Sequence, residues 1–337
     1  MRYDSRGFRL GLVVAALALV TASCSDASST TLTVYSGRSE NLVGPLFDRF
    51  TEETGIGLAV RYAGSTDLAA TLREEGSNSP ADVFFAQDPA SLGAVAEAGL
   101  LATLPDDLLG LVDPRFSDAR GRWVGTSGRA RVVVYDTTRL SPDDLPSTVF
   151  GFTEPEWAGR VGIAPTNGSF LAFVAAMIVI KGETATAAWL DGLAANHPGK
   201  YEKNSPIVAA VEGGEIETGL VNHYYLLRLQ AEEGETAAAN HFLANGGPGS
   251  LVMPAGAGVL ATSDDRESAE RLIEFLLSME AQRYFAEETF EYPLVSGVEP
   301  VAGLPPLELL GAPALDLSAL ARALDRATDL VAEAGLL

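Results

Sequence analysis

Short apolar segments alternate with segments of helical period after Thr31, and this alternation limits what the chain can fold into. A short apolar run predicts a strand, and apolar residues at every third or fourth position predict a helix. Strands are expected at 32–35, 57–62 and 81–86, with helices at 41–54, 66–75 and 88–98. A βαβαβ order of this kind predicts a mostly parallel sheet covered by helices.

A second set of α/β elements is expected from Ala130 onward. Its strands are predicted at 131–136, 160–164 and 250–262, the last interrupted by Pro254, Gly256 and Gly258. Its helices are predicted at 168–180, 183–195, 206–213, 226–233, 265–289 and 317–334. A length of 337 residues leaves room for about two domains, so the two sets predict two α/β lobes. The cleft between such lobes, at the carboxyl ends of strands, is the expected ligand site.

The N-terminal segment, residues 1–23, has the features of a signal peptide. Three arginines (Arg2, Arg6 and Arg9) precede an apolar stretch at 10–20, which is too short for a permanent membrane span. Cys24 is the only cysteine, and its position resembles the lipidated cysteine of bacterial lipoproteins, although Thr21 stands where leucine is usual. The expectation is an extracytoplasmic protein anchored through Cys24, with 24–31 as a polar tether. A soluble secreted protein with an incidental thiol is the alternative.

The charge balance excludes some partners. The formal net charge is -22, and the basic signal segment makes the remainder more negative still. Such a chain is repelled by nucleic acid and by anionic lipid, so neither is expected as a partner. The net charge does not identify the ligand, because surface carboxylates can surround a site of either sign.

Two adjacent tyrosines, Tyr224 and Tyr225, follow Asn222 and His223 where an apolar segment gives way to a helix-like run. Neighbouring side chains within one strand point to opposite faces, but at a strand-to-helix junction they can converge. Two phenolates are hard anionic oxygen donors, which suit ferric iron, and a bound cation can remove their protons. A pair of core tyrosines is the alternative. His223 is either a further ligand or a side chain that points away.

Three other loops fall at predicted strand ends: 36–40, 87–88 and 165–169. The last opens a helix with small polar residues, which predicts either an anion site or an ordinary cap. Asp88 before Pro89 is typical of a helix N-cap, which is favoured over a metal ligand. Arg38 and Glu40 read as solvated turn residues. The sequence has no metalloprotease-type histidine spacing and no nucleophile elbow, so an enzyme is not expected.

Several short motifs, in this order, resemble the ferric-iron-binding proteins of bacterial ABC importers. They are Thr33–Gly37, Ala81–Phe85, Ser127–Val132, Pro165–Phe170, Lys203–Ser205, Asn222–Tyr225 and Glu291–Leu294. The resemblance covers nearly the whole chain from Thr31. It implies the type II periplasmic-binding-protein fold, with two lobes that close by hinge motion. We expect an N-lobe of 32–130 plus 256–305 and a C-lobe of 131–255 plus 306–337.

The resemblance also implies a function and a set of site residues. Tyr224 and Tyr225 would ligate ferric iron, and a synergistic anion, phosphate or carbonate, would lie beside Asn167, Gly168, Ser169, Asn204 and Asn222. Many members have a histidine where Ser39 stands and a glutamate where Gln87 stands, so Asp88, Glu40, water or the anion would complete the coordination. Arg38, Arg129 or Arg131 would hold the anion through charge-assisted hydrogen bonds.

The implied protein is a monomeric, non-enzymatic carrier that delivers iron to an ABC permease. The first alternative is the same fold with another ligand: a thiamine derivative, a phosphonate, a polyamine or an oxyanion. An extracellular hydrolase and a structural lipoprotein are the more distant alternatives, and neither has a supporting motif.

Overall fold

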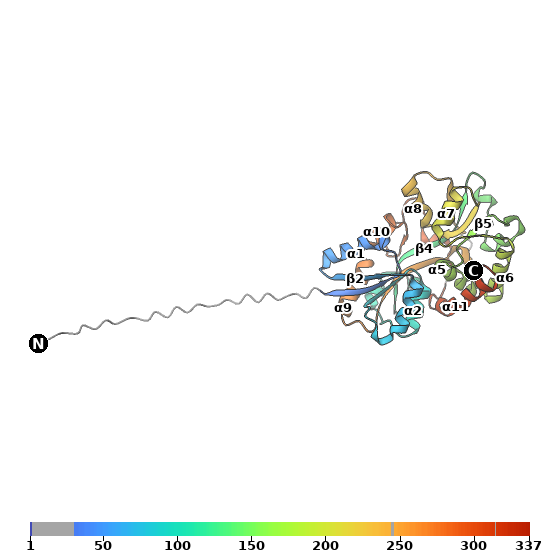
Figure 1. Cartoon of the computed structure of the whole chain (residues 1–337). Coiled ribbons are helices and arrows are strands. Elements are labelled where there is room, and N and C mark those ends of the chain that lie inside the picture. The colour runs from blue at the N-terminus through green and yellow to red at the C-terminus, as the bar shows by residue number, and fades with distance from the viewer. Residues whose placement is uncertain (2–29, 244–245, 314) are drawn as a thin grey trace.

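Two groups of α/β elements lie at opposite ends of the molecule in the computed structural model (Figure 1). The structure describes residues 1, 30–243, 246–313 and 315–337. Cys24 and most of the predicted signal peptide lie outside these residues. Within the described ranges, no helix is long and apolar enough to cross a membrane.

The strands form one sheet in the order β2-β1-β3-β9-β4-β7-β5-β6, with β8 and β10 also paired to β4. Their bounds are β1 Thr31–Ser36, β2 Gly57–Tyr62, β3 Val83–Ala86, β4 Val124–Asp136, β5 Val161–Ile163, β6 Gly199–Lys200, β7 Thr218–Asn222, β8 Ala238–His241, β9 Val252–Val259 and β10 Tyr292–Pro293. Strands β1, β2 and β3 pair in parallel, as do β5, β6 and β7. The prediction of a mostly parallel sheet therefore holds for these pairs, whereas β3 is antiparallel to its other neighbour, β9.

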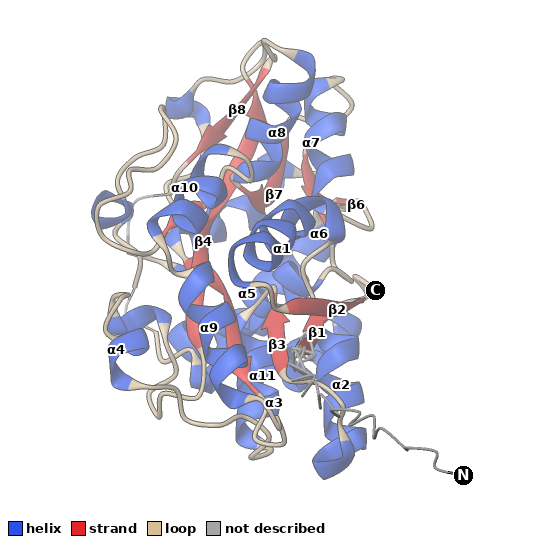
Figure 2. Ribbon diagram, turned by 90° about the vertical axis from the view of Figure 1, so that its left-hand side faces the viewer, coloured by secondary structure: helices blue, strands red, loops and turns tan. Residues whose placement is uncertain are grey.

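The long strand β4 joins the two groups, and here the parallel prediction is wrong. Its first half, up to Ala130, is antiparallel to β9 and β10, and its second half, from Arg131, is antiparallel to β7 and β8. Figure 2 shows β4 passing from one group to the other. Strand β4 leads the chain from the first group to the second, and β9 leads it back. The two strands therefore run in opposite directions where they pair. The lobe boundaries themselves stay a prediction.

The return strand β9 is continuous, whereas the sequence predicted an interrupted one. Pro254, Gly256 and Gly258 all lie within it. A Cβ atom on Gly256 would stand 2.6 Å from the carbonyl oxygen of Val124 on β4. The glycine is thus explained by the close approach of the two strands and does not interrupt the ladder.

Eleven helices are described. They are α1 Glu40–Thr54, α2 Ser65–Glu75, α3 Pro89–Glu97, α4 Asp106–Leu109, α5 Gly168–Lys181, α6 Glu183–Ala195, α7 Asn204–Glu212, α8 Tyr224–Glu233, α9 Arg266–Leu276, α10 Met279–Glu287 and α11 Ser318–Glu333. The region predicted as helical at 265–289 is two helices, because α9 ends at Leu276 and the Ser278 hydroxyl caps α10 by accepting from the Ala281 N–H at 3.2 Å. The helix predicted at 226–233 begins two residues earlier, at Tyr224.

The closing helix α11 is confirmed, and it packs against both α3 and α5. Leu320, Ala327 and Val331 are buried in a core that also contains residues of those two helices. Helices α3 and α5 follow β3 and β5 in the chain, and Asp88 and Ser169 at their starts line one cavity with Arg129 and Arg131 of β4. The fold therefore places Asp88 and Asn167, which precede these helices, near the predicted cleft.

Candidate functional site

The two predicted metal-binding tyrosines stack on each other in the first turn of α8. The ring centroids of Tyr224 and Tyr225 lie 4.2 Å apart, with the planes inclined by 28°. Tyr224 is buried and Tyr225 is partly exposed. Burial, followed by the effect of Tyr225, raises the pKa of Tyr224 well above its ordinary value. The Tyr224 phenol is therefore protonated at neutral pH until a cation displaces the proton.

His223 points into the interior, which settles the alternatives that the sequence left open. Its Nδ1 accepts from the Ala130 N–H at 3.1 Å, and its Nε2 lies 2.8 Å from the Phe290 carbonyl oxygen. A nitrogen that accepts carries no proton, so Nε2 carries it and donates. Both ring nitrogens are thus engaged with the backbone, and His223 is not a free metal ligand. In the described part of the chain, no three His, Cys, Asp or Glu side chains gather as a metal site.

Three buried arginines, Arg38, Arg129 and Arg131, interact electrostatically with the tyrosine pair. In each of them Nε and Nη1 have no hydrogen-bond partner within the described residues. The charges of Arg38 and Arg129 act to lower the pKa of Tyr224, although burial outweighs them. Burial lowers the pKa of Arg131 to about 9, and Tyr225 opposes that shift. Unpaired buried donors are costly, so these guanidinium groups indicate a place for an anionic acceptor.

Arg38 is not a solvated turn residue, which corrects the prediction. It is 1% exposed, and its Nη2 donates to Glu291 Oε1 at 2.7 Å. The other carboxylate oxygen of Glu291 accepts from the Ser127 hydroxyl at 2.5 Å. Burial acts to lower the pKa of Arg38, but the charges of Glu291 and of the tyrosines raise it overall.

A small cavity lies beside two of the three buried arginines, Arg129 and Arg131. It is lined by Asp88, Arg129, Arg131, Ser169, Ala172, Phe173, Asn222, Leu251 and Met253. About 10 Å³ is open to the centre of a water molecule, which is enough for about one water. Arg131 also lies over the Phe173 ring, 5.0 Å from its centroid, and donates to the Leu220 carbonyl at 2.8 Å. The cavity is therefore lined by two arginines, the Asp88 side chain, two further polar residues and four apolar residues.

The predicted anion loop forms a connected polar cluster at the start of α5. Asn167 caps the helix, since its side chain accepts from the Ser169 N–H at 3.0 Å. The Asn204 amide donates to Asn167 Oδ1 at 3.3 Å and to Ser169 Oγ at 3.2 Å. Asn204 is buried, and its own Oδ1 lacks a partner among the described residues. A Cβ on Gly168 would meet nothing within 4 Å, so the helix end beside it is open.

The other site residues predicted in the N-lobe are either engaged in a helix cap or exposed to solvent at least in part. Asp88 is the N-cap of α3 and accepts from the backbone N–H and the hydroxyl of Ser91, as the cap prediction stated. Burial raises the pKa of Asp88, against the effects of Ser91 and Arg129. Ser39 and Glu40 are exposed, and the Gln87 side chain is partly exposed. The only hydrogen bond described for Gln87 is its backbone N–H to Ser65 Oγ, at 2.8 Å.

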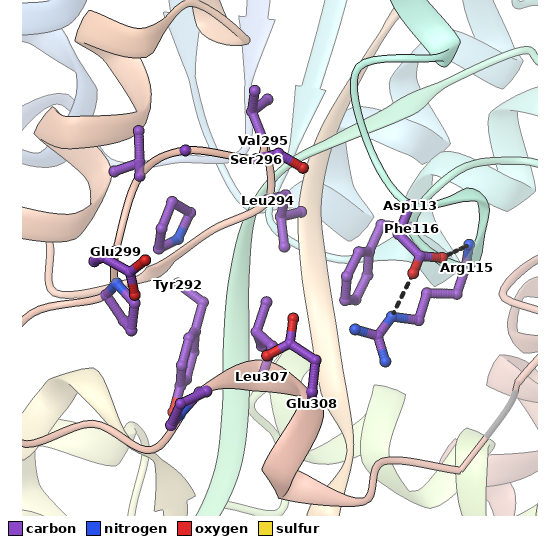
Figure 3. A pocket seen from close by; sticks show the side chains of 15 residues that line it. Asp113, Arg115, Phe116, Tyr292, Leu294, Val295, Ser296, Glu299, Leu307 and Glu308 are labelled. Carbon is purple, nitrogen blue, oxygen red and sulfur yellow. Dashed lines mark hydrogen bonds and ion pairs between the residues drawn. The ribbon is translucent and has the colours of Figure 1, made fainter.

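A larger hollow lies elsewhere, beside β10 (Figure 3). Asp113 and Arg115 form an ion pair of 3.5 Å at this hollow, and the carboxylates of Glu299 and Glu308 also line it. None of the predicted site residues lines it. The candidate site is therefore the smaller, more enclosed region around the tyrosines and the three arginines.

A family comparison agrees with this architecture. The sequence profile of the family described as bacterial extracellular solute-binding protein matches residues 78–309, about two thirds of the chain. The chain belongs to this family. The fold predicted from the motifs, the type II fold of periplasmic binding proteins, is thereby confirmed, together with the resemblance to the ferric-binding proteins.

Individual relatives of this solute-binding protein cover it almost entirely. It is 37% identical over 340 residues to the major ferric iron-binding protein of Neisseria meningitidis serogroup B, covering 97% of this chain and 98% of the relative. It is 33% identical to the Fe(3+)-binding periplasmic protein of Serratia marcescens, covering 100% and 99%. The crystal structure of iron-bound HitA from Pseudomonas aeruginosa superimposes with a TM-score of 0.86 at 36% identity, covering 91% of this chain and 100% of that one.

One member of the site of this solute-binding protein is not identified by the sequence motifs. Glu291 belongs to one of them, yet it is 0% exposed and pairs with Arg38 across 253 positions of sequence. Its place directly before the β10 strand, in an otherwise apolar stretch, was the available signal. A charge in such a stretch is buried only if it is paired.

Acidification is expected to destabilise the apoprotein through His223. Burial lowers the pKa of this ring to about 4, whereas an unfolded histidine titrates near 6.5. The unfolded chain therefore binds the extra proton first, and the contribution of His223, about 3 kcal/mol, is lost as pH falls from 6.5 to 4. Urea unfolding from pH 7 to 4 should show a steeper loss in the wild type than in His223→Asn. Equal slopes would contradict the prediction.

Proposed function

We propose that this protein captures ferric iron outside the cytoplasm, together with a synergistic anion, and delivers it to an ABC import permease. The proposal rests above all on the stacked phenols of Tyr224 and Tyr225 among three buried guanidinium groups with unpaired N–H groups. The named relatives are ferric-iron-binding proteins, which supports this choice of metal. The same relatives are binding proteins, so a carrier is favoured over an enzyme.

The charges of the site favour an anion beside the metal. Ferric iron bound by two phenolates keeps one positive charge. Arg38, Arg129 and Arg131 add three more, and the carboxylates of Glu291 and Asp88 remove at most two. A surplus of roughly two positive charges in a buried site is costly, and a carbonate or hydrogen phosphate dianion would neutralise it.

We propose that the anion occupies a widened form of the small cavity, because its present volume admits only about one water, and that it accepts hydrogen bonds from the free Nε and Nη1 groups of the three arginines. Ser169 and Asn222 line this cavity, and Asn167 and Asn204 belong to the polar cluster that includes Ser169, with Gly168 between Asn167 and Ser169. Ser39 and Gln87 are not ionisable, so the anion would also occupy coordination positions that an N-lobe histidine and glutamate fill in many relatives. The acidic residues next in sequence to Ser39 and Gln87 are Glu40 and Asp88.

The deciding experiment is metal analysis of protein purified without chelators, together with its visible spectrum. About one iron per chain and a phenolate-to-iron charge-transfer band are expected. Titration with ferric citrate and then with phosphate separates this function from an oxyanion or phosphonate carrier, which the buried arginines also suit. Phosphate binding without iron binding or colour would favour that second function. The buried positive charges disfavour a polyamine.

Iron binding should weaken as the solution becomes acidic. Both phenols lose a proton when they ligate the metal, so protons compete with iron and affinity falls by up to roughly 100-fold per pH unit. The charge-transfer absorbance of loaded protein should therefore disappear between pH 8 and pH 4.5, while circular dichroism shows that the fold persists. A band that survives until the protein unfolds would contradict phenolate coordination.

We also propose that Cys24 is lipidated and anchors the chain on the outer side of the membrane. In cells that process lipoproteins, Cys24→Ala should shift the protein from the membrane fraction to the soluble fraction. Immunoblotting of the two fractions measures the shift, and Ser23→Ala is a suitable control because it leaves the cysteine in place. Equal membrane association of all three proteins would contradict lipidation.

A further inference from the structure

We propose that His223 is a positioning residue that couples the tyrosine pair to the Arg38–Glu291 ion pair. This inference rests on the proposed function, because it treats Tyr224 and Tyr225 as iron ligands. His223 is not itself a ligand here. Its role follows from contacts that join the start of α8 to three other parts of the fold.

His223 is held at both its side chain and its backbone. The Ala130 N–H donates to the ring at Nδ1, and the His223 N–H donates back to the Ala130 carbonyl at 3.0 Å. The His223 carbonyl accepts from the Asn240 amide at 2.8 Å. The ring also packs against Tyr292, with centroids 4.9 Å apart. The residue directly before the tyrosine pair therefore has almost no freedom to move.

The contact with Ala130 lies at the point where β4 changes partners. Up to Ala130 the strand pairs with β9, and from Arg131 it pairs with β7 and β8. Any hinge motion between the two groups of elements must pass through this strand. His223 thus ties the first turn of α8 to the crossing point.

The second ring nitrogen reaches the other group of elements. Nε2 donates to the carbonyl of Phe290, a non-glycine residue with a φ of 59°, which is uncommon for a bulky side chain. The next residue, Glu291, holds Arg38 at 2.7 Å and accepts from Ser127 at 2.5 Å. A short chain of contacts therefore runs from Tyr224 through His223 and the 290–291 backbone to Arg38.

This series of contacts links the proposed metal ligands to the proposed anion donors. The phenols supply the metal ligands, and Arg38 supplies donors for the anion. Their relative position is fixed by the His223–Phe290 hydrogen bond. If that bond is lost, the ring no longer holds the 290–291 backbone, and the Arg38 guanidinium can shift relative to the phenols.

Two substitutions test the hydrogen bonds of the two His223 ring nitrogens separately. His223→Asn keeps an acceptor near Ala130 but cannot reach Phe290, whereas His223→Gln can place an amide donor at the Phe290 carbonyl. His241→Asn is the matched control, because His241 lies on β8 with its ring against Tyr135, 6.4 Å between centroids. The measurements are the wavelength of the charge-transfer band and the rate of iron release to excess chelator in phosphate buffer.

We expect His223→Asn to shift the band and to speed release by about 10–100-fold, the usual effect of losing an outer contact of a metal site. His223→Gln should recover part of the loss, and His241→Asn should match the wild type. An unchanged band and release rate in His223→Asn, even with a lower melting temperature, would overturn the inference. A wild type that binds no iron would instead overturn the proposed function.

A measurement on the unaltered protein keeps the inference testable if the variants do not fold. Nitrogen-15 NMR of the wild type, empty and loaded with diamagnetic gallium, reports the state of each histidine ring nitrogen. The Nε2–H tautomer of His223, with slow proton exchange, is expected in both states. Direct coordination of gallium by the ring, or a change of tautomer on loading, would overturn the positioning role.

Discussion

Replacing Tyr224 and Tyr225 together by phenylalanine is expected to abolish both iron binding and the visible colour. Each single change should weaken iron binding by at least about 100-fold, because a lost ligand costs more than a lost outer contact. The rings are stacked, and phenylalanine preserves that packing while it removes the phenol oxygen. Metal analysis and the charge-transfer absorbance after loading with ferric citrate measure the effect.

Tyr201→Phe is the matched control, since this phenol lies outside the candidate site and bonds Glu215 at 2.9 Å. That variant should load iron like the wild type. Because the Tyr224→Phe change removes a buried hydroxyl, circular dichroism must show that the double variant is folded. A folded double variant that keeps its iron and its colour would refute the assignment of the tyrosines.

The periodic parts of the fold could be predicted because their amphipathic pattern is local. The helix predicted at 41–54 is observed as α1, Glu40–Thr54, with Val43, Leu46 and Phe50 buried on one face. The length of β4 could not be predicted in the same way. Its first half contains Gly125, Gly128 and Arg129, which do not resemble a buried strand, and these residues are buried only because both groups of elements enclose them.

The site residues also differ in whether a local sequence pattern could predict them. The tyrosines and the 165–169 loop could be recognised from neighbouring residues in the sequence, since each is a short local motif. Arg38 could not be recognised as buried, because its partner Glu291 is distant in sequence and local charge patterns say nothing of such pairs. The orientation of His223 was also out of reach, since it depends on the backbone of Ala130 and Phe290.

The Arg38–Glu291 pair makes a second strong prediction, about stability. Arg38→Met should lower the unfolding free energy of the apoprotein by about 3–5 kcal/mol, since among the described residues it leaves the buried Glu291 carboxylate with the Ser127 hydroxyl as its one side-chain partner. The double change of Arg38 and Glu291 to methionine should recover most of that loss, because it removes both charges. Urea unfolding at pH 7, followed by circular dichroism, gives the three free energies.

The exposed pair Arg49–Glu280 supplies the control for burial. Its side chains are 44% and 49% exposed, and the N–O distance is 3.3 Å. Glu280→Gln should cost no more than about 1 kcal/mol, because solvent screens such a pair. Two outcomes would show that Arg38 does not hold the buried carboxylate: a cost of Arg38→Met as small as that of Glu280→Gln, or a double variant no more stable than Arg38→Met. Either outcome would require a new charge balance for the proposed anion site.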